Sequence, residues 1–333
     1  MRILYVSGYN RMVLFNKLIP KALRKNGHRV AEFDWNSVLS WNKVFNFFSG
    51  EKIKRVRGER LLKAIESVKP ELIFVLKGEG LDFETLGRIQ KDYSVPMCNW
   101  FGDDPWEFPV FSGPASKYYT HFFTYDPFSV KLYRDAGHQN AFHLPYGYDT
   151  ETTASVELTS QDKEKYGCEI SFVGTHYSER EEWLNKLAES YSIKIWGRGW
   201  NNTSLTHLYQ GSALYGYDML KALKAAKVVL NLHKDFDKGP EHSGNGLNLR
   251  VMEAAACGAC QVSNFQEDIP NRFENGSEII LFNTYEELTD RLNYLLSSES
   301  ARQEIGRGAF NRVKREHTLE HRMAELTEKI KTR

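Results

Sequence analysis

The chain has 333 residues, of which 41% are hydrophobic, so it is long enough for two domains that each bury a core. Its 44 basic and 43 acidic residues give a formal net charge of +1, and this balance does not require a nucleic acid or an anionic membrane as partner. The four cysteines are too few and too scattered for a disulfide framework in a chain of this length.

The first part of the sequence alternates short apolar runs with longer segments of helical spacing. The run at 2–7 predicts a strand, and the segment at 15–26 predicts a helix that Gly27 ends. Five further runs have the composition of strands, at 28–34, 71–80, 95–105, 120–126 and 140–149.

A polar stretch rich in Ser and Thr, 150–166, then interrupts the alternation and is typical of a linker or a long surface loop. Alternation on both sides of a polar joint predicts an α/β fold, in which two Rossmann-like domains each hold a doubly wound parallel sheet. The tail at 301–333 predicts only helix. The strands expected after the joint lie at 169–174, 193–200, 227–233 and 260–264.

Glycines and charged residues follow many of these strands. Ligands of an open parallel sheet bind outside the carboxyl ends of its strands, so such residues are candidates for a site. Two edges of this kind, facing each other, would form a polar interdomain cleft. The candidates in the first half are Ser7, Gly8, Lys77, Glu79, Asp103 and Asp104, and those in the second half are Gly174, Thr175, His176, Arg198 and His233.

The stretch GTHYSERE at 174–181 predicts an anion site. Ser178 and Glu181 match a capping box, so we expect a helix to begin there. A glycine turn into a helix N-terminus suits a phosphate group, because free backbone N–H groups and the positive end of the helix dipole point the same way. Arg180 would add a guanidinium to that site. An ordinary turn with a solvated Arg180 fits the same residues equally well.

Arg250 and Glu253 stand out as two charges in an apolar helical stretch, 248–264. They are three residues apart and therefore share one helical face, close behind the glycine-rich loop 239–246. A carboxylate can accept hydrogen bonds from both hydroxyls of a ribose, and an arginine can grip a diphosphate through two N–H groups. The pair therefore suits a nucleoside diphosphate, and the alternative is an ion pair between the two side chains.

Five motifs resemble those of the GT-B nucleotide-sugar glycosyltransferases, and more narrowly those of the spore-maturation, CgeB-type group. They are NWFGDDP at 99–105, LPYGYD at 144–149, SFVGTHYSER at 171–180, NLRVMEAAACGA at 248–259 and HTLEHR at 317–322. The resemblance covers nearly the whole chain and is more specific in its second half. It implies an acceptor domain at 1–149, a linker at 150–166, a donor domain at 167–310 and a final helix at 311–333 that packs back on the first domain.

By this resemblance Glu253 would hold the ribose of the donor, and Arg250, Arg180 and the Gly174 turn would hold its diphosphate. The donor would be a nucleotide sugar, foremost a UDP-sugar, with no cofactor and no metal. Further donor contacts are expected from Thr175, His176, Arg198, Tyr217, His233 and Asn248. Acceptor contacts are expected from Ser7, Gly8, Lys77, Glu79 and Trp100.

The chemistry stays open at two points. If transfer inverts the configuration, a base must take the acceptor proton, and Asp103 or Asp104 is the nearest candidate by topology. Asn245 stands eight positions before Glu253, where the wider group often has an acidic residue, so the sequence does not decide between retention and inversion. The acceptor is equally open among a glycan, a glycolipid and a modified nucleic acid.

Other readings compete with this one. Asp235 and Asp237 form a D-x-D pattern that metal-dependent GT-A transferases use, which would imply a different fold. A non-catalytic nucleotide-sugar binding module also fits. A dinucleotide-dependent oxidoreductase fits less well, because no G-x-G-x-x-G follows a predicted strand.

Two more segments have alternative interpretations. At 38–60 an aromatic stripe precedes a basic run, which suits a membrane surface beside a lipid-linked acceptor, or phage DNA, although a helix packed on the first sheet explains the same pattern. Cys257 and Cys260 form a C-x-x-C that suits a redox or zinc site, but their small neighbours favour packing. With no leader and no apolar run that could span a bilayer, we expect a cytoplasmic protein without stable membrane insertion.

Overall fold

The computed structural model describes residues 1–8, 14–37, 50–211, 213–236, 238 and 240–331. The chain folds into two compact units, of which the first comprises Met1–Pro145 with Leu319–Arg333 and the second comprises Tyr146–Thr318. The divisions thus fall at 145/146 and 318/319, close to the expected 149/150 and 310/311. The aromatic stripe expected within 38–60 lies outside the described residues.

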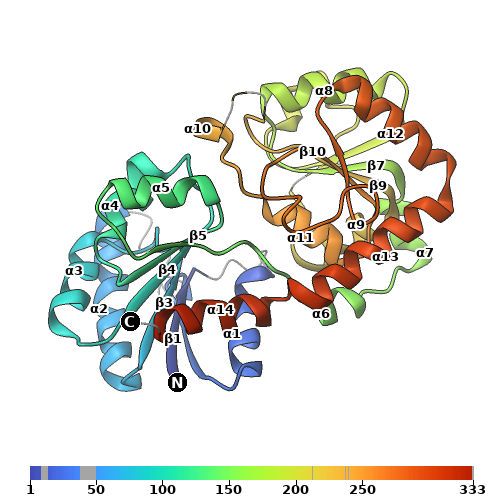
Figure 1. The fold of residues 1–333 in the computed structure, drawn as a ribbon. Helices are drawn as coiled ribbons and strands as arrows, with labels where there is room; N and C mark the ends of the chain where they lie inside the picture. The colour runs from blue at the N-terminus through green and yellow to red at the C-terminus, as the bar shows by residue number, and fades with distance from the viewer. Residues whose placement is uncertain (9–13, 38–49, 212, 237, 239, 332–333) are drawn as a thin grey trace. The chain divides into compact units, whose positions relative to one another are not determined.

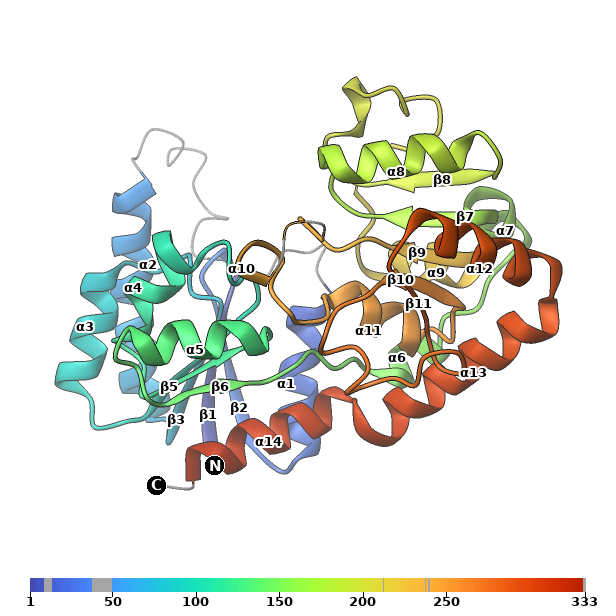
Figure 2. The ribbon, with the colours of Figure 1, turned by 45° about the horizontal axis from the view of Figure 1, so that its top comes forward.

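The first unit is built on a six-stranded parallel sheet of order β2-β1-β3-β4-β5-β6. Figures 1 and 2 show α2 and α3 on one face of this sheet and α1 with α14 on the other. The strands are β1 (Arg2–Ser7), β2 (Arg29–Asp34), β3 (Leu72–Leu76), β4 (Met97–Phe101), β5 (His121–Thr124) and β6 (Ala141–His143). The helices are α1 (Phe15–Lys25), α2 (Gly50–Val68), α3 (Phe83–Asp92), α4 (Gly113–Ser116), α5 (Pro127–Asp135) and α14 (Leu319–Lys331).

The central strands of this sheet are buried along their whole length. Every residue of β3 and β4 is buried, as expected for a parallel sheet that helices cover on both faces. Two aspartates in the loops after β3 and β5 start the next helix: Asp82 accepts a hydrogen bond from Thr85 N–H, and Asp126 accepts one from Ser129 N–H. These caps fix where the chain leaves the carboxyl edge of the sheet.

The second unit has a five-stranded parallel sheet of order β11-β10-β9-β7-β8. The strand β11 was not predicted from the sequence. The strands are β7 (Cys168–Val173), β8 (Ile193–Trp196), β9 (Ala226–Asn231), β10 (Gln261–Asn264) and β11 (Ile280–Phe282). The helices are α6 (Thr150–Ala154), α7 (Ser160–Tyr166), α8 (Ser178–Ala188), α9 (Gly216–Ala225), α10 (Pro240–Ser243), α11 (Leu249–Ala256), α12 (Tyr285–Ser297) and α13 (Glu299–Glu316).

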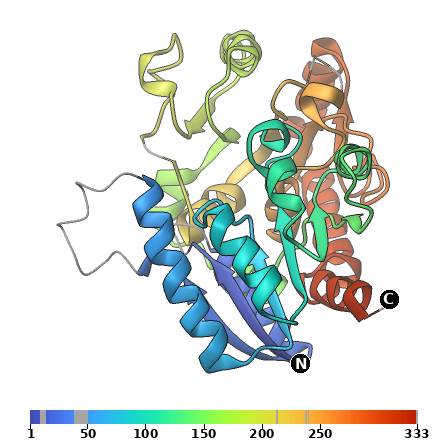
Figure 3. The ribbon, with the colours of Figure 1, turned by 90° about the vertical axis from the view of Figure 1, so that its left-hand side faces the viewer.

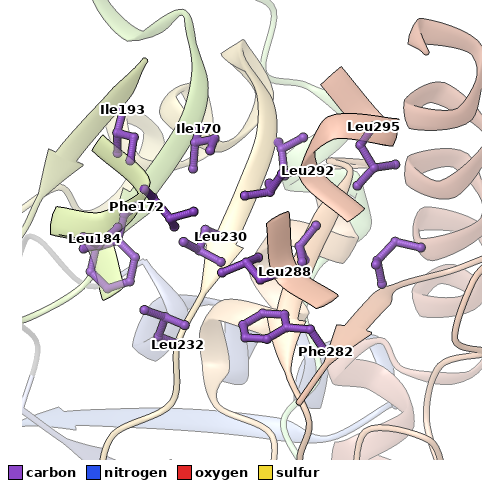
Figure 4. Close-up of a cluster of buried hydrophobic side chains, with 14 of the residues drawn as sticks. Ile170, Phe172, Leu184, Ile193, Leu230, Leu232, Phe282, Leu288, Leu292 and Leu295 are labelled. Atoms are coloured by element: carbon purple, nitrogen blue, oxygen red, sulfur yellow. The ribbon is translucent and has the colours of Figure 1, made fainter. Parts of the chain in front are cut away.

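The core of the second unit lies between its sheet and two of these helices. Figure 4 shows Leu184 of α8 and Leu288 and Leu292 of α12 packed against Phe172 and Leu230 of the central strands. All five side chains are at most 2% exposed. Because α8 is held by this core, the turn that precedes it is held as well, and that turn follows the carboxyl end of β7.

The segment 150–166, expected to be a linker or a long surface loop, contains two short helices. The helix α6 begins after Asp149, whose carboxylate accepts from Thr152 N–H, and α7 begins at a capping box in which Thr159 and Asp162 exchange hydrogen bonds. Both helices are short and polar, so composition alone resembled that of a loop. Helix signals were nevertheless present in the spacing of Thr159 and Asp162.

The helical tail divides at His317–Thr318 into two helices that belong to different units. The helix α13 stays in the second unit, whereas α14 packs against α1 of the first. The contact includes an ion pair of 2.9 Å between Lys25 Nζ and Glu320 Oε1, and Asn26 Nδ2 donates to the Glu320 carbonyl oxygen at 2.8 Å. Figure 3 shows the blue strands of the first sheet between α2 and the red helix α14.

No helix within the described ranges combines the length and the apolar character that crossing a bilayer requires.

Candidate functional site

The turns after β7 and β8 interlock at the carboxyl edge of the second sheet. Gly174 N–H donates to the Trp196 carbonyl at 2.9 Å, and the Trp200 indole N–H donates to the Gly174 carbonyl at 2.8 Å. Gly197 passes so close that a Cβ there would lie 1.8 Å from the Gly174 oxygen. The glycines at this edge therefore allow two backbone turns to touch.

The capping box expected from Ser178 and Glu181 is wrong. The helix α8 begins at Ser178 with Tyr177 as its N-cap, and within the described residues no side chain caps it. The Glu181 carboxylate instead accepts from Ser204 and bonds His176, and these contacts, Ser204 first, hold the pKa of Glu181 below its usual value. The N–H groups of the first turn of α8 are thus left available to an anion.

Arg180 faces inward and is not solvated. It is 8% exposed and donates to two carbonyl oxygens, those of Thr175 at 2.8 Å and Leu232 at 2.6 Å. Its guanidinium lies 4.8 Å from the ring centroid of Tyr177, and burial lowers the pKa of Arg180 to about 10. The reading of Arg180 as a solvated side chain is therefore wrong, and the residue joins the turn after β7 to the end of β9.

His233 is buried and supports the start of α11. Its Nε2 accepts from Asn248 N–H at 3.2 Å, so the ring proton sits on Nδ1, which lies 3.0 Å from Asn264 Oδ1. Burial lowers the pKa of His233 to about 4, which keeps the ring neutral near pH 7. Asn248 in turn caps α11 through its side chain, which accepts from Val251 N–H. These contacts explain both residues as supports for the helix that carries Arg250 and Glu253.

Arg250 and Glu253 meet as an ion pair, which was the alternative interpretation of their spacing. Arg250 Nη1 lies 2.5 Å from Glu253 Oε2, Nη1 also contacts the Met219 sulfur, and Nε donates to the Val173 carbonyl at 3.2 Å. Glu253 is 6% exposed, and burial raises the pKa of its carboxyl although Arg250 opposes the rise. The pair thus joins α11 to the last residue of β7, directly before Gly174.

The remaining candidates of the second unit lie closer to the surface. Arg198 is exposed in the turn after β8, and Tyr217 is 55% exposed in the first turn of α9. Asn245 donates to Glu267 at 2.6 Å. Lys234 also follows β9 in the sequence but was not among the expected donor contacts. Its ammonium lies 5.4 Å from the ring centroid of Tyr177, which the Arg180 guanidinium also contacts, and its position directly after His233 is the signal that could have identified it.

The alternative metal and redox sites find little support in the second unit. Asp235 is described, but Asp237 lies outside the described residues, and the described residues contain no group of three or more potential metal ligands. Cys257 and Cys260 are buried free thiols, and burial raises the pKa of each to about 12. Such thiols are poor nucleophiles near pH 7, as expected for residues that pack a helix end.

At the carboxyl edge of the first sheet, three charged side chains gather after β3 and β4. Lys77 forms ion pairs with Glu79, at 3.2 Å, and with Asp103. Burial acts to lower the pKa of Lys77, but the two carboxylates together outweigh it and hold the pKa above its usual value. All three side chains are more than a third exposed, so the cluster is accessible to a ligand.

Asp104 points the opposite way from Asp103 and is closed to solvent. Its oxygens accept from the hydroxyls of Ser112, Thr124 and Tyr133, at 2.7–2.8 Å. Burial raises the pKa of Asp104 to about 6 in spite of these bonds. A carboxylate so enclosed cannot reach an acceptor, so Asp104 is not the base and instead anchors the loop that carries Asp103.

Two of the expected acceptor contacts are also buried. Trp100 is 1% exposed and its indole N–H donates to the Leu144 carbonyl at 3.0 Å, so it belongs to the core and does not contact an acceptor. Ser7 is buried and its hydroxyl accepts from Asn16, which also donates to the Gly8 carbonyl. In a strand buried on both faces, an aromatic residue near the end has no face that is open to a ligand.

Comparison with known proteins links this architecture to glycosyltransferases. Residues 179–328 match a family model described as glycosyl transferase-like, a range that contains Arg180, His233, Arg250 and Glu253. The search among curated proteins found no match.

Several solved structures share the fold over the whole chain. Sucrose-phosphate synthase from Thermosynechococcus elongatus has a TM-score of 0.70 at 10% identity, and the match covers 99% of this chain and 98% of the synthase chain. Anabaena Alr3699/HepE in complex with UDP-glucose has a TM-score of 0.66 at 11% identity and covers both chains completely. A putative UDP-N-acetylglucosamine 2-epimerase from Listeria monocytogenes has a TM-score of 0.60 at 12% identity, and the match covers 99% of this chain and 96% of the epimerase chain. The two parallel-sheet units of this chain therefore have the GT-B fold.

Proposed function

We propose that this protein is a glycosyltransferase that moves a sugar, a hexose foremost, from a UDP-sugar to an acceptor hydroxyl without a metal ion. The observation that carries the proposal is the Arg250–Glu253 pair on α11, in which Glu253 is buried, next to the uncapped start of α8 and the interlocked glycine turns. The glycosyl transferase-like match and the UDP-glucose complex of a structural neighbour support it. We place the protein in the CgeB-type group and in the cytoplasm.

Glu253 is the group that would hold the donor ribose. An ionised carboxylate can accept hydrogen bonds from two hydroxyls at once. When the donor binds, Glu253 would give up its contact with Arg250 and accept from the ribose hydroxyls instead. The released guanidinium would then bind the diphosphate. A buried charge is costly without a partner, so the pair stays satisfied in both arrangements.

The diphosphate would lie at the first turn of α8. Its N–H groups, the helix dipole and the cations of Arg250 and Lys234 supply positive potential where negative charge develops as the sugar bond breaks. Arg180 supports this site through the Thr175 and Leu232 carbonyls. These groups would do the work that a divalent ion does in metal-dependent transferases.

Asp103 is the remaining candidate for a base in the first unit, because Asp104 is buried. Lys77 holds the Asp103 carboxylate in place while leaving it partly exposed. In a non-catalytic binding module, substitution of Asp103 would change no measurable property, because there is no turnover to lose. We therefore expect Asp103→Asn to lower kcat by about a hundredfold with UDP-glucose affinity unchanged. Equal turnover of the variant and the wild type would show that Asp103 is not the base.

A thermal-shift panel tests the donor site. We expect UDP to stabilise the protein more than GDP, ADP or TDP, and EDTA to leave the shift unchanged. Glu253→Gln should weaken UDP affinity by about tenfold or more, because a charge-assisted hydrogen bond to the ribose is lost.

The control for this substitution is Glu267→Gln, a change of the same kind at a carboxylate that bonds only the Asn245 side chain in the described part of the chain. Absence of any shift with all four nucleotides would refute the proposed function. Dependence of the shift on manganese would refute the metal-independent mechanism.

A further inference from the structure

His176 and Glu181 form a hydrogen-bonded pair at the turn after β7. Nε2 of His176 lies 2.6 Å from Oε2 of Glu181, and Oε1 accepts from the backbone N–H and the hydroxyl of Ser204 at 3.0 and 2.6 Å. The Ser204 hydroxyl also lies 2.7 Å from Asn185 Nδ2. Because both oxygens of Glu181 are engaged, the carboxylate has a fixed orientation, and it fixes the imidazole ring in turn.

Two further contacts and one glycine keep the ring in place. His176 N–H donates to the Arg198 carbonyl at 2.8 Å, and the ring stands edge-on to Trp200, with centroids 4.9 Å apart and planes at 88°. Gly199, with φ of +86°, leaves room for the ring, since a Cβ there would lie 3.1 Å from His176 Cβ. A side chain held this firmly on a turn between two strands is preorganised, as functional groups are.

The free atom of this arrangement is Nδ1. Glu181 accepts from Nε2, so in the neutral ring Nδ1 carries the lone pair, and it is the atom that gains or loses a proton. The side chain is 28% exposed, and no residue in the described part of the chain bonds Nδ1. The turn that carries His176 is the one that leads into the uncapped first turn of α8.

We propose that His176 donates a proton to the leaving diphosphate of the sugar donor, with Glu181 as the residue that positions its imidazole. This inference rests on the proposed function, which places the diphosphate at the first turn of α8. In the step, the bond between the sugar C1 and the β-phosphate oxygen breaks and its electron pair goes to that oxygen. The proton on His176 Nδ1 moves to the diphosphate. The acceptor oxygen bonds C1 and loses its own proton to the general base that the proposed function requires, so atoms and charges balance.

The charged groups around the ring decide how it responds to pH. Glu181 faces it from α8, and Arg198 lies in the turn after β8 with its side chain exposed. Arg180 lies behind the same turn, bonded to the Thr175 carbonyl. Arginines stay charged between pH 5.5 and 8, and the lowered pKa of Glu181 keeps its carboxylate charged as well. Of these groups, Glu181 is the one that contacts the ring directly.

Affinity for UDP-glucose, measured by calorimetry at several pH values, tests the proposal. The two phosphates of UDP-glucose do not titrate in this range, unlike the terminal phosphate of UDP, so the sugar nucleotide isolates the protein group. We expect wild-type affinity to fall by about tenfold as the pH rises from 5.5 to 8, because the charge-assisted bond to the phosphate is lost. We expect the affinity of His176→Gln for UDP-glucose to show no such fall between pH 5.5 and 8, and we expect a lower kcat at pH 6.

Two further variants complete the test. His207→Gln, at an exposed histidine of the same unit, should keep the wild-type profile. Glu181→Gln should keep binding but shift the fall in affinity to lower pH, which a merely structural role of Glu181 would not do. If His176→Gln keeps the wild-type pH profile, the histidine is not the proton donor, although the proposed function stands. If the wild type binds no UDP-glucose at any pH, both the proposed function and this inference fall.

Discussion

Single charged residues at the ends of parallel strands can face either of two ways, and this chain uses both. Asp103 faces solvent with Lys77, whereas Asp104 turns inward to three hydroxyl groups. His233 likewise faces inward, toward Asn264 and the N–H of Asn248. Sequence reasoning located these residues at the correct edge of the sheet, but the direction of a side chain depends on partners from distant segments.

We expect that an apolar pair can replace Arg250 and Glu253 without loss of folding stability, but not without loss of donor binding. Glu253→Leu alone leaves the Arg250 guanidinium, on a side chain that is only 19% exposed, without its carboxylate, and we expect the free energy of unfolding to fall by about 3 kcal/mol. Adding Arg250→Met, beside Met219, should restore most of this loss, because the site then becomes apolar throughout. Urea unfolding at pH 7.5 measures both. If the double variant is no more stable than Glu253→Leu, the unpaired Arg250 is not the cause of the loss of stability.

Whole elements were predicted better than their details. The alternation of apolar runs and helical spacing identified ten of the strands, because a buried parallel strand is a continuous apolar run. The three-residue strand β11 is too short to produce such a run. The helices α6 and α7 were missed since short exposed helices are polar on most of their surface, so their only signals were the caps at Asp149 and Thr159.

The contact between the turns after β7 and β8 predicts a strong effect of a small substitution. In Gly197→Ala the new Cβ would overlap the Gly174 oxygen, so the turn before α8 must move. We expect a loss of about 2 kcal/mol in stability and a weaker UDP-glucose complex. Gly211→Ala is the matched control, because Gly211 also has positive φ, +105°, but among the described residues no atom beyond its chain neighbours lies within 4 Å of the added atom. Equal effects of the two substitutions on thermal unfolding would contradict the role of the contact.

At the scale of the molecule, the two units bury opposite kinds of titratable group. Asp104 in the first unit has a raised pKa, so its protonated form is favoured in the folded state. Its contribution to stability is present at low pH and is lost as the pH rises through about 6. His233 in the second unit has a lowered pKa, so its neutral form is favoured, and stability is lost as the pH falls from about 6.5 toward 4. Mild acid should therefore act on the two units in opposite directions.

Lowering the pH from 7.5 to 5.0 tests this contrast. We expect the second unit to lose about 2 kcal/mol through His233, and the first to gain about 1 kcal/mol through Asp104. Hydrogen-exchange mass spectrometry, corrected for the intrinsic pH dependence of exchange, reports each unit through its own peptides. His233→Gln should remove the acid sensitivity of peptides from β9 and α11, and Asp104→Asn should remove the gain in peptides from β4 and β5. Protection that changes equally in both units, or that changes alike in wild type and variants, would show that other groups control the response to acid.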